Sequence, residues 1–247
     1  MFFTVTILMK RLDEIISLIG SSKGVADIGT DHGYLPVKLA LSGFQGFLFA
    51  SDVNQGPLCA AKRVAEEKGV SEKITFSLSD GLSACEPQNI DCIVIAGMGG
   101  DLISAIISRA KWAYSEAYHL ILQPMTKPEV LRAFLIQNGF HIVDERLVKE
   151  NSRIFTIISA RYSDKALLEK LSDAEMITGA YSLISKSELF PELISRELRR
   201  LEKKITGRSS AGITSNSENA EYIKCIHISK QMNEMQCRFN SSVDVSE

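Results

Sequence analysis

Short apolar runs alternate with longer amphipathic stretches from about residue 9 to residue 160 of this chain. Such alternation is typical of β-α-β units, in which helices join parallel strands and cover the sheet. The apolar runs predict strands at residues 24–29, 46–53, 74–80, 90–98, 117–124, 140–150 and 153–162. The amphipathic stretches predict helices that begin near Tyr34, Gly56, Asp101 and Lys127. We therefore expect an α/β domain with a largely parallel sheet.

Only Asn151 and Ser152 separate the last two predicted strands. Because two residues cannot form a parallel crossover, we predict that these strands pair as an antiparallel hairpin. Five parallel strands with an antiparallel hairpin at one edge are typical of the seven-stranded, Rossmann-like sheet of S-adenosylmethionine-dependent methyltransferases. We predict this fold over residues 9–162, preceded by an N-terminal extension of residues 1–8.

The chain after residue 162 has no convincing strand, and its pattern predicts helices within 164–187, 191–207 and 219–239. We expect a helical C-terminal domain over residues 163–239 and a disordered polar tail over residues 240–247. One helix face carries basic residues at spacings of three and four: Arg196, Arg199, Arg200, Lys203 and Lys204. Glu197 and Glu202 partly offset this charge. Simple solvation of the face and contact with an anionic partner both explain the pattern.

Composition adds few constraints. The chain is 45% apolar and 23% charged with a formal net charge of −2, values typical of a soluble globular protein. Any RNA contact must therefore come from a local basic patch rather than from overall charge. Five cysteines without a C-x-x-C pair predict reduced thiols in the cytoplasm and neither disulfides nor a structural metal. No apolar run approaches the 18 residues of a membrane span, so we expect no membrane association.

Polar residues and glycines gather where the first four predicted strands end. In an open parallel sheet, ligands bind beyond these carboxyl ends, at the point where the strand order reverses. Asp52 follows Asp27 by 25 residues and could accept both hydroxyls of a ribose, while Asp80 could accept from an adenine amino group. The strand ends carry Asp27, Gly29, Asp31, His32, Gly33, Asp52, Asn54, Asp80, Gly81 and the segment AGMGGD at 96–101.

The loop after the first strand discriminates between two ligand classes. Its sequence G-T-D-H-G lacks the G-x-G-x-x-G pattern of dinucleotide sites, and Asp31 would repel a diphosphate. S-adenosylmethionine has no phosphate and carries a sulfonium and an ammonium group, so Asp27 or Asp31 could face its ammonium. The loop therefore favours S-adenosylmethionine over a nicotinamide cofactor. Asp31 could instead be the N-cap of the following helix.

The segment AGMGG after the fourth strand differs from the [N/D]-P-P-[Y/F] loop usual in methyltransferases that act on exocyclic amines. Three glycines beside Met98 suggest close approach of the backbone to the cofactor or to a base. A tight turn from strand to helix would explain the glycines equally well.

Four segments of the chain, VADIGTDHGYLP, DVNQGPLCAA, IAGMGGDLI and LILQPMTKPEVLRAFLIQNGF, resemble the bacterial tRNA (adenine-22-N1)-methyltransferases. The resemblance covers residues 9–160, and LFPELISRELRRLEKKI resembles the coiled-coil-like C-terminal domain of that family. It implies S-adenosylmethionine-dependent methylation of N1 of adenine 22 in the D-arm of tRNA. The implied cofactor residues are Asp27, Gly29, Asp31, Asp52, Asn54, Asp80, Gly81 and Gly97. Two departures are Gly33 in place of alanine and IFTII in place of a segment with a Tyr-Glu pair.

At the catalytic end, the resemblance implies roles for His32, Tyr34 and Met98, and we add Asp31 as a further catalytic candidate. Adenine N1 has an in-plane lone pair, so the enzyme must extrude and align the base rather than supply a strong general base. Tyr34 could stack on the base, and Asp31 or His32 could contact its amine or assist proton loss. His32 could equally be a structural hydrogen-bonding residue.

Binding of tRNA would use the basic helix face between Arg196 and Lys204, together with Lys111, Lys127 and Arg132 from the first domain. We expect a monomer. Alternative functions are a small-molecule methyltransferase, a non-catalytic RNA-binding protein that retains the cofactor fold, and a nicotinamide oxidoreductase.

Overall fold

The computed structural model describes residues 10–164, 170–211 and 216–243. The predicted N-terminal extension and the last residues of the predicted tail, 244–247, lie outside the described residues. The chain divides into two compact units, residues 1–169 and 170–247, and each is described by itself.

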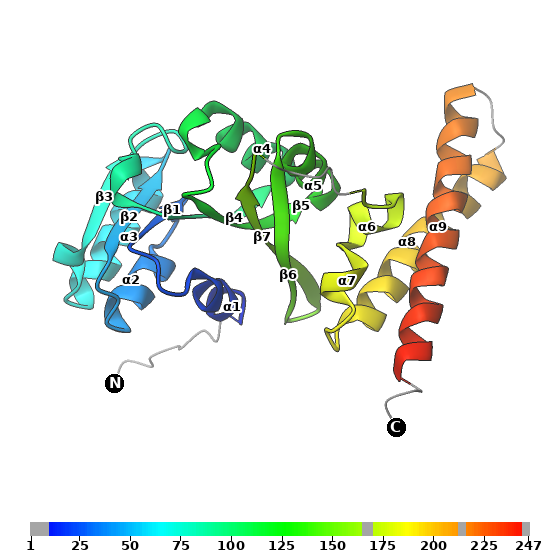
Figure 1. Cartoon of the computed structure of the whole chain (residues 1–247), viewed down its shortest axis with the longest axis horizontal. Coiled ribbons are helices and arrows are strands. Elements are labelled where there is room, and N and C mark those ends of the chain that lie inside the picture. Colours follow the sequence, from blue (N-terminus) through cyan, green and yellow to red (C-terminus); the bar gives the residue numbers. More distant parts are fainter. Residues whose placement is uncertain (1–9, 165–169, 212–215, 244–247) are drawn as a thin grey trace. The chain divides into compact units, whose positions relative to one another are not determined.

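The first unit contains a seven-stranded sheet with the strand order β3-β2-β1-β4-β5-β7-β6 (Figure 1). Neighbours among β1 to β5 pair in parallel, as the sequence predicts. The strands are β1 (Gly24–Ile28), β2 (Phe47–Asp52), β3 (Ile74–Leu78), β4 (Cys92–Gly99), β5 (His119–Thr126), β6 (Phe140–Glu150) and β7 (Arg153–Tyr162). The predicted fold class is therefore confirmed.

The predicted antiparallel hairpin of β6 and β7 is also confirmed. β7 lies between β5 and β6 and is antiparallel to both. Consequently β6 runs in the same direction as β5, and Glu150 at its end reaches the carboxyl edge of the sheet, as does Thr126 at the end of β5. This edge also holds the ends of β1 and β4, where the strand order reverses.

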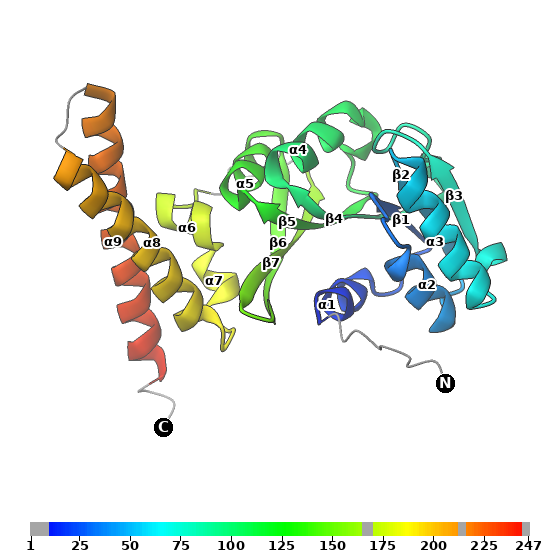
Figure 2. The same cartoon turned by 180° about the vertical axis from the view of Figure 1, so that it is seen from behind.

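Helices cover both faces of the sheet (Figures 1 and 2). One core cluster joins apolar residues of α1, α2 and α3 to the strands, including Ile15, Leu39 and Ala65. α4 and α5 contact β4 and β5 from the other side, where Ile103 and Leu131 are fully buried. The helices of this unit are α1 (Lys10–Ile19), α2 (Tyr34–Leu41), α3 (Gln55–Glu67), α4 (Gly100–Arg109) and α5 (Pro128–Gln137), with 3-10 turns η1 (Ser71–Lys73), η2 (Pro87–Asn89) and η3 (Lys111–Ala113).

Arg132 occupies the inner side of α5 and corrects one sequence-based expectation. Its side chain is fully buried, and its Nε donates to Oε1 of Glu145 on β6 at 2.8 Å. A guanidinium enclosed in this way cannot contact RNA. Its partner carboxylate offsets the cost of burying the charge, and together they link α5 to the sheet.

The described residues of the second unit form α6 (Asp173–Thr178), α7 (Tyr181–Ile184), α8 (Phe190–Ala211) and α9 (Asn216–Val243). α8 and α9 lie side by side with opposite chain directions, so a helical C-terminal part is present as predicted (Figure 1). Gly179, with a φ of 112°, separates α6 from α7 within the stretch predicted as one helix.

Two predicted helix ends in this unit are wrong. α8 continues beyond Gly207 to Ala211, because a single glycine costs an established helix only about 1 kcal/mol. α9 continues to Val243, so residues 240–243 are helical rather than part of a disordered tail.

Candidate functional site

Two carboxylates mark the end of the central strands. Asp27 and Asp52 are 7% and 9% exposed, on the neighbouring strands β1 and β2. The Thr30 hydroxyl donates to Oδ2 of Asp27 at 2.6 Å, and the backbone N–H of Asn54 donates to Oδ1 of Asp52 at 2.8 Å. The structure thus brings the predicted residues Asp27, Asp52 and Asn54 to one edge.

The environment of Asp27 makes its carboxyl group harder to ionise than an exposed one. Burial, together with the negative charge of nearby Asp52, raises the pKa of Asp27 to about 6, although the hydrogen bond from Thr30 opposes part of this shift. A cationic ligand beside this carboxylate would stabilise the ionised form. The site therefore suits a positively charged group better than an anionic one.

The loop after β1 is held by backbone contacts. The N–H groups of Gly29 and Thr30 both donate to the Ser51 carbonyl, at 2.8 and 2.9 Å. Gly29 has a φ of 74° and Asp31 a φ of 48°, so two residues of this loop adopt the left-handed conformation. The loop is consequently a defined turn that projects Asp31 outward.

Asp31, His32 and Tyr34 form an exposed group at the end of this loop. Nε2 of His32 lies 3.8 Å from Oδ1 of Asp31, and the His32 and Tyr34 rings are 5.4 Å apart between centroids. Gly33 is the N-cap of α2, and no side chain caps this helix. The alternative interpretation of Asp31 as an N-cap is therefore wrong.

Gly33 itself explains one departure from the family pattern. Its φ is 68°, and a β-carbon there would lie 2.9 Å from the β-carbon of Ala61 on α3. Glycine avoids both the backbone strain and this contact.

Met98 on β4 lies against the loop that follows β1. A β-carbon at Gly29 would lie 2.1 Å from the terminal methyl of Met98, so the methyl group sits directly against the Gly29 α-carbon. The structure thereby joins the two glycine-containing segments that the sequence singled out.

The glycines of AGMGG have different causes. A β-carbon at Gly100 would lie 2.2 Å from the Lys127 carbonyl oxygen, and one at Gly99 would lie 2.6 Å from Oδ1 of Asp101. These two glycines therefore follow from a tight turn and close packing. Gly97 is exposed, has a φ of 83°, and has open space at the β-carbon position. Gly97 is the glycine of this segment that leaves room for a ligand.

Asp80 already has a partner at the end of β3. Both of its carboxylate oxygens accept from Arg109 of α4, at 2.7 and 2.9 Å. A cavity of about 190 Å³ lies beside this pair, and Leu82, Ile106 and Trp112 contribute its apolar lining. Gly81, buried with a φ of 58°, forms the turn that leads from Asp80 into this lining.

The basic face of α8 is only partly free of acidic partners. Arg196 and Arg200 both pair with Glu197, at 3.1 and 3.3 Å, whereas Arg199, Lys203 and Lys204 are exposed. In the first unit, the exposed Lys127 donates to Asp101 at 2.8 Å. Lys111, also exposed, stacks over the Tyr114 ring.

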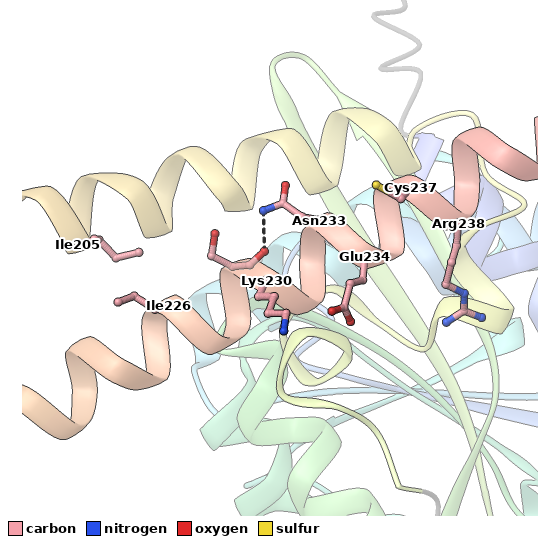
Figure 3. A pocket seen from close by; sticks show the side chains of 8 residues that line it. Ile205, Ile226, Lys230, Asn233, Glu234, Cys237 and Arg238 are labelled. Carbon is pink, nitrogen blue, oxygen red and sulfur yellow. Dashed lines mark hydrogen bonds between the residues drawn. The ribbon is translucent and has the colours of Figure 1, made fainter.

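A groove of about 760 Å³ lies between α8 and α9 in the second unit (Figure 3). Ile205 and Ile226 face each other across it, and Lys230, Glu234 and Arg238 project from α9. None of the strand-end residues lines this groove.

Sequence reasoning missed several contacts at the carboxyl edge. Thr30 and Arg109 bind the predicted carboxylates, while Arg11 of α1 reaches Gln123 on β5 at 3.0 Å. A Thr three residues after Asp27 was a visible local signal, but the arginine contacts had none.

Among the described residues, no group of three or more His, Cys, Asp and Glu side chains is placed to hold a metal ion. Within the same part of the chain, no helix combines the length and apolar character needed to cross a membrane.

Comparison with known proteins assigns the family. A family model described as a methyltransferase domain matches residues 8–158. The chain is 31% identical over 194 residues to the tRNA (adenine(22)-N(1))-methyltransferase of Bacillus subtilis strain 168, covering 78% of this chain and 82% of that protein.

Two solved structures support the same family assignment. The crystal structure of the B. subtilis m1A22 tRNA methyltransferase TrmK is 26% identical with a TM-score of 0.79, covering 92% of this chain and 97% of that one. A Streptococcus pneumoniae protein described as a tRNA (m1A22) methyltransferase, in complex with S-adenosyl-L-methionine, is 29% identical with a TM-score of 0.74, covering 92% and 98% of the two chains. By sequence and by fold, this chain belongs to the tRNA (adenine(22)-N(1))-methyltransferase family.

Proposed function

We propose that this protein methylates N1 of adenine 22 in tRNA, with S-adenosyl-L-methionine as the methyl donor. The observation that carries the proposal is the family match, which spans 82% of a tRNA (adenine(22)-N(1))-methyltransferase. The strand-end geometry supports it, because buried carboxylates stand at the sheet's switch point where a cationic, phosphate-free ligand fits. A nicotinamide oxidoreductase is disfavoured by the loop after β1, which lacks the G-x-G-x-x-G pattern and carries Asp31, a residue that would repel a diphosphate.

The cofactor residues in this proposal are those of the carboxyl edge. Asp27 would face the ammonium group, since its raised pKa reflects a buried carboxylate that a cation would stabilise. Asp52, with Asn54 beside it, would accept the ribose hydroxyls. Gly29 and Gly97 would allow close approach of the backbone. When bound, the cofactor supplies an electrophilic methyl group on its sulfonium.

The adenine of the cofactor would lie in the cavity beside Asp80. A flat aromatic ring fits the apolar lining of Leu82 and Ile106, and Asp80 could accept from its amino group. Arg109 would keep the Asp80 carboxylate oriented. Gly81 would form the turn between Asp80 and Leu82, which both line the cavity.

The catalytic end would be built from Asp31, His32, Tyr34 and Met98. Adenine N1 is unprotonated at neutral pH, so these residues need to hold an extruded base in line with the methyl group rather than remove a proton from N1. Tyr34, 40% exposed, offers a face for stacking. Asp31 carries a negative charge that would stabilise the cationic product, and His32 lies between the two in sequence.

Phosphates of the tRNA would contact the basic face of α8, comprising Arg196, Arg199, Arg200, Lys203 and Lys204. The exposure of Arg199, Lys203 and Lys204 supports this assignment. We accordingly assign residues 9–162 to cofactor binding and catalysis and residues 163–239 to tRNA binding, in a cytoplasmic monomer.

The test is to incubate the purified protein with labelled S-adenosyl-L-methionine and unmodified bacterial tRNA, then digest the RNA and identify the methylated nucleoside. We expect 1-methyladenosine, and its loss when adenine 22 is replaced in a defined transcript. Methylation that survives this replacement would refute the position. Cofactor binding without any incorporation into tRNA would instead support a small substrate or a non-catalytic role.

A variant tests the catalytic end separately. Asp31→Ala should lower turnover on tRNA, because the carboxylate that faces the developing cation is removed. Full activity and full cofactor affinity in this variant would remove Asp31 from the mechanism.

A further inference from the structure

Arg11, the second residue of α1, binds three elements of the sheet at its carboxyl edge. Its backbone N–H and its Nε donate to the two carboxylate oxygens of Glu150 at the end of β6, at 2.8 and 2.6 Å. Its Nη1 donates to Oε1 of Gln123 on β5 at 3.0 Å and lies 3.4 Å from the sulfur of Met125. Its guanidinium carbon lies 4.4 Å from the centre of the Phe155 ring on β7.

Gln123 connects Arg11 to the backbone at the end of β5. Its side chain is 1% exposed, and its Nε2 donates to the Pro124 carbonyl at 2.9 Å. The Gln123 amide is therefore held by Arg11 through its oxygen and fixes the backbone of β5 through its nitrogen. A buried amide with both ends bound has little freedom to rotate.

The end of β5 in turn sets the position of the AGMGG segment. Met98 pairs with Pro124 and Gly99 with Thr126, across two irregularities in the β4–β5 register. Among the described strands, β1 pairs with β4 only before this segment, so β5 is the strand that positions Met98 and Gly99. Met98 carries its terminal methyl against Gly29, at the centre of the proposed methyl-transfer site.

We propose that Arg11 is a positioning residue for methyl transfer, acting through Gln123 and the end of β5 to hold Met98 against Gly29. The expected loss of turnover rests on the proposed function. The expected displacement of Met98 does not. It also gives the last strand a role at the site, because Phe155 lies in the IFTII segment that departs from the family pattern.

Arg146 provides a matched comparison, since it also joins α1 to β6. Its Nη1 donates to Oε2 of Glu14 at 3.0 Å and to the Ser17 hydroxyl at 2.7 Å, and its Nε donates to Asp144 at 3.0 Å. None of these groups belongs to β5. Arg146→Ala therefore weakens the attachment of α1 to β6 while leaving the Arg11–Gln123 contact in place.

The first measurement uses no substrate. The full chain is labelled with carbon-13 at its methionine methyl groups, and the Met98 and Met125 resonances are assigned from Met98→Leu and Met125→Leu variants. Arg11→Ala should shift or broaden both resonances, while Arg146→Ala should leave the Met98 resonance unchanged. An unmoved Met98 resonance in Arg11→Ala, or an equal shift in Arg146→Ala, would overturn the proposal.

The second measurement compares turnover. Arg11→Ala should lower kcat for tRNA methylation on the order of a hundredfold, as expected for a reacting geometry displaced by about 1 Å, with KM for both substrates within about threefold. Arg146→Ala should keep kcat within about threefold. Equal losses of kcat in the two variants would overturn the proposal, because attachment of α1 alone would then explain them.

Arg11→Lys is a second variant that tests the proposal if Arg11→Ala fails to fold. Lysine can still pair with Glu150, but it lacks the second arm that reaches Gln123. We expect a folded protein with the Met98 resonance displaced and kcat reduced about tenfold. Wild-type kcat and an unmoved resonance in this variant would contradict the proposal. If wild-type protein fails to methylate tRNA, the proposed function fails, and the methyl resonances still decide whether Arg11 positions Met98.

Discussion

The carboxyl edge of the sheet and the basic face of α8 both carry charge, but they hold it in different ways. At the edge, Asp27 and Asp52 are almost completely buried and each accepts a defined hydrogen bond. On α8, Arg199 and Lys203 project from one helix into solvent. The buried carboxylates fix the direction and distance of their contacts with a ligand. The exposed cations instead produce a positive electrostatic potential over the helix face.

This difference predicts different responses to substitution. A buried carboxylate acts in a weakly screened environment, so its removal should have a large and specific effect. Exposed cations act together through phosphate contacts, so their effect should be distributed and should depend on salt. The following predictions test this contrast, beginning with the largest effect.

Asp27→Asn should weaken S-adenosyl-L-methionine binding by roughly a hundredfold, the loss expected for a charged hydrogen bond worth about 1.5–3 kcal/mol. Because the pKa of Asp27 is about 6 in the free protein, a cationic ligand must bind the ionised form. Affinity of the wild type should therefore rise as the pH increases through 6, and Asp27→Asn should flatten this dependence. Isothermal titration between pH 5 and 8 measures both effects.

Asp13→Asn is the control for this prediction, since Asp13 is exposed and pairs with Lys38 on the surface. An affinity loss in Asp13→Asn as large as that in Asp27→Asn would contradict a specific role for the buried carboxylate.

Gly29→Ala tests the contact with Met98. Alanine would need the left-handed conformation and would displace the Met98 methyl, which is the flexible end of its side chain. Gly69→Ala is a matched control, because Gly69 has a φ of 68° with open space at the β-carbon position. Both variants should lose about 1 kcal/mol of folding free energy, but only Gly29→Ala should lose tenfold or more in kcat.

Denaturant unfolding and steady-state methylation of tRNA measure these two quantities. Equal kcat values in the two glycine variants would show that the close approach of Met98 to Gly29 is not needed for turnover.

Charge reversal at Arg199, Arg200 and Lys203 addresses the other half of the contrast. We expect tRNA affinity to fall roughly tenfold and the slope of log K against log salt to become shallower by about 2–3, because each lost phosphate contact removes about 0.7–0.9. Cofactor affinity should not change. Binding assays across a salt series measure the slope.

The same number of reversals at Lys62 and Arg63 of α3 and at Lys68, its C-cap, serves as the control because these side chains are also exposed. A tRNA affinity and salt slope that match the wild type in the α8 variant would exclude this face as the tRNA contact.

The sequence predicts the parts of this molecule that depend on local pattern. Strand ends and helix starts follow from alternating apolar runs, so Asp27, Asp52 and Asp80 could be placed at the carboxyl edge before the structure. The position of Gly97 and Met98 followed from the same reasoning.

Contacts between distant segments had no comparable signal. Arg11 lies 139 residues from Glu150, and Arg109 lies 29 residues from Asp80. Arg132 looked like a surface cation, although its place between Leu131 and Leu135 on an inward-facing helix was a usable sign of burial. The end of α8 was missed because local glycine and serine content predicts a break, although a single glycine costs an established helix only about 1 kcal/mol.

The smallest expected effect is on folding stability in acid. It compares Asp27 at the carboxyl edge of the sheet with His119 at the opposite edge. His119, at the start of β5, lies 2.7 Å from the Ser159 hydroxyl, and burial lowers the pKa of His119 to about 4. The positive charge of nearby Arg161 contributes to this lowering of the pKa, and the negative charge of Asp91 opposes it. Because unfolded histidine titrates near 6.5, the stability due to neutral His119 is present above that pH and is lost as the pH falls toward 4.

Asp27 changes the pH dependence of folding stability in the opposite direction to His119. Its folded pKa of about 6 exceeds the unfolded value of 3.8, so the folded state takes up protons first and gains stability as the pH falls from 6 to 4. The two contributions, each at most about 1.4 kcal/mol per pH unit, partly cancel in the wild type. Asp27→Asn should therefore lose stability more steeply on acidification, and His119→Gln less steeply, in urea unfolding between pH 4.5 and 6.5. The α8 triple variant should follow the wild type, because its substituted side chains are exposed and none of them contributes to either shift. Parallel curves for all four proteins would mean that neither buried group controls acid stability, and that the carboxyl edge differs from α8 in geometry alone.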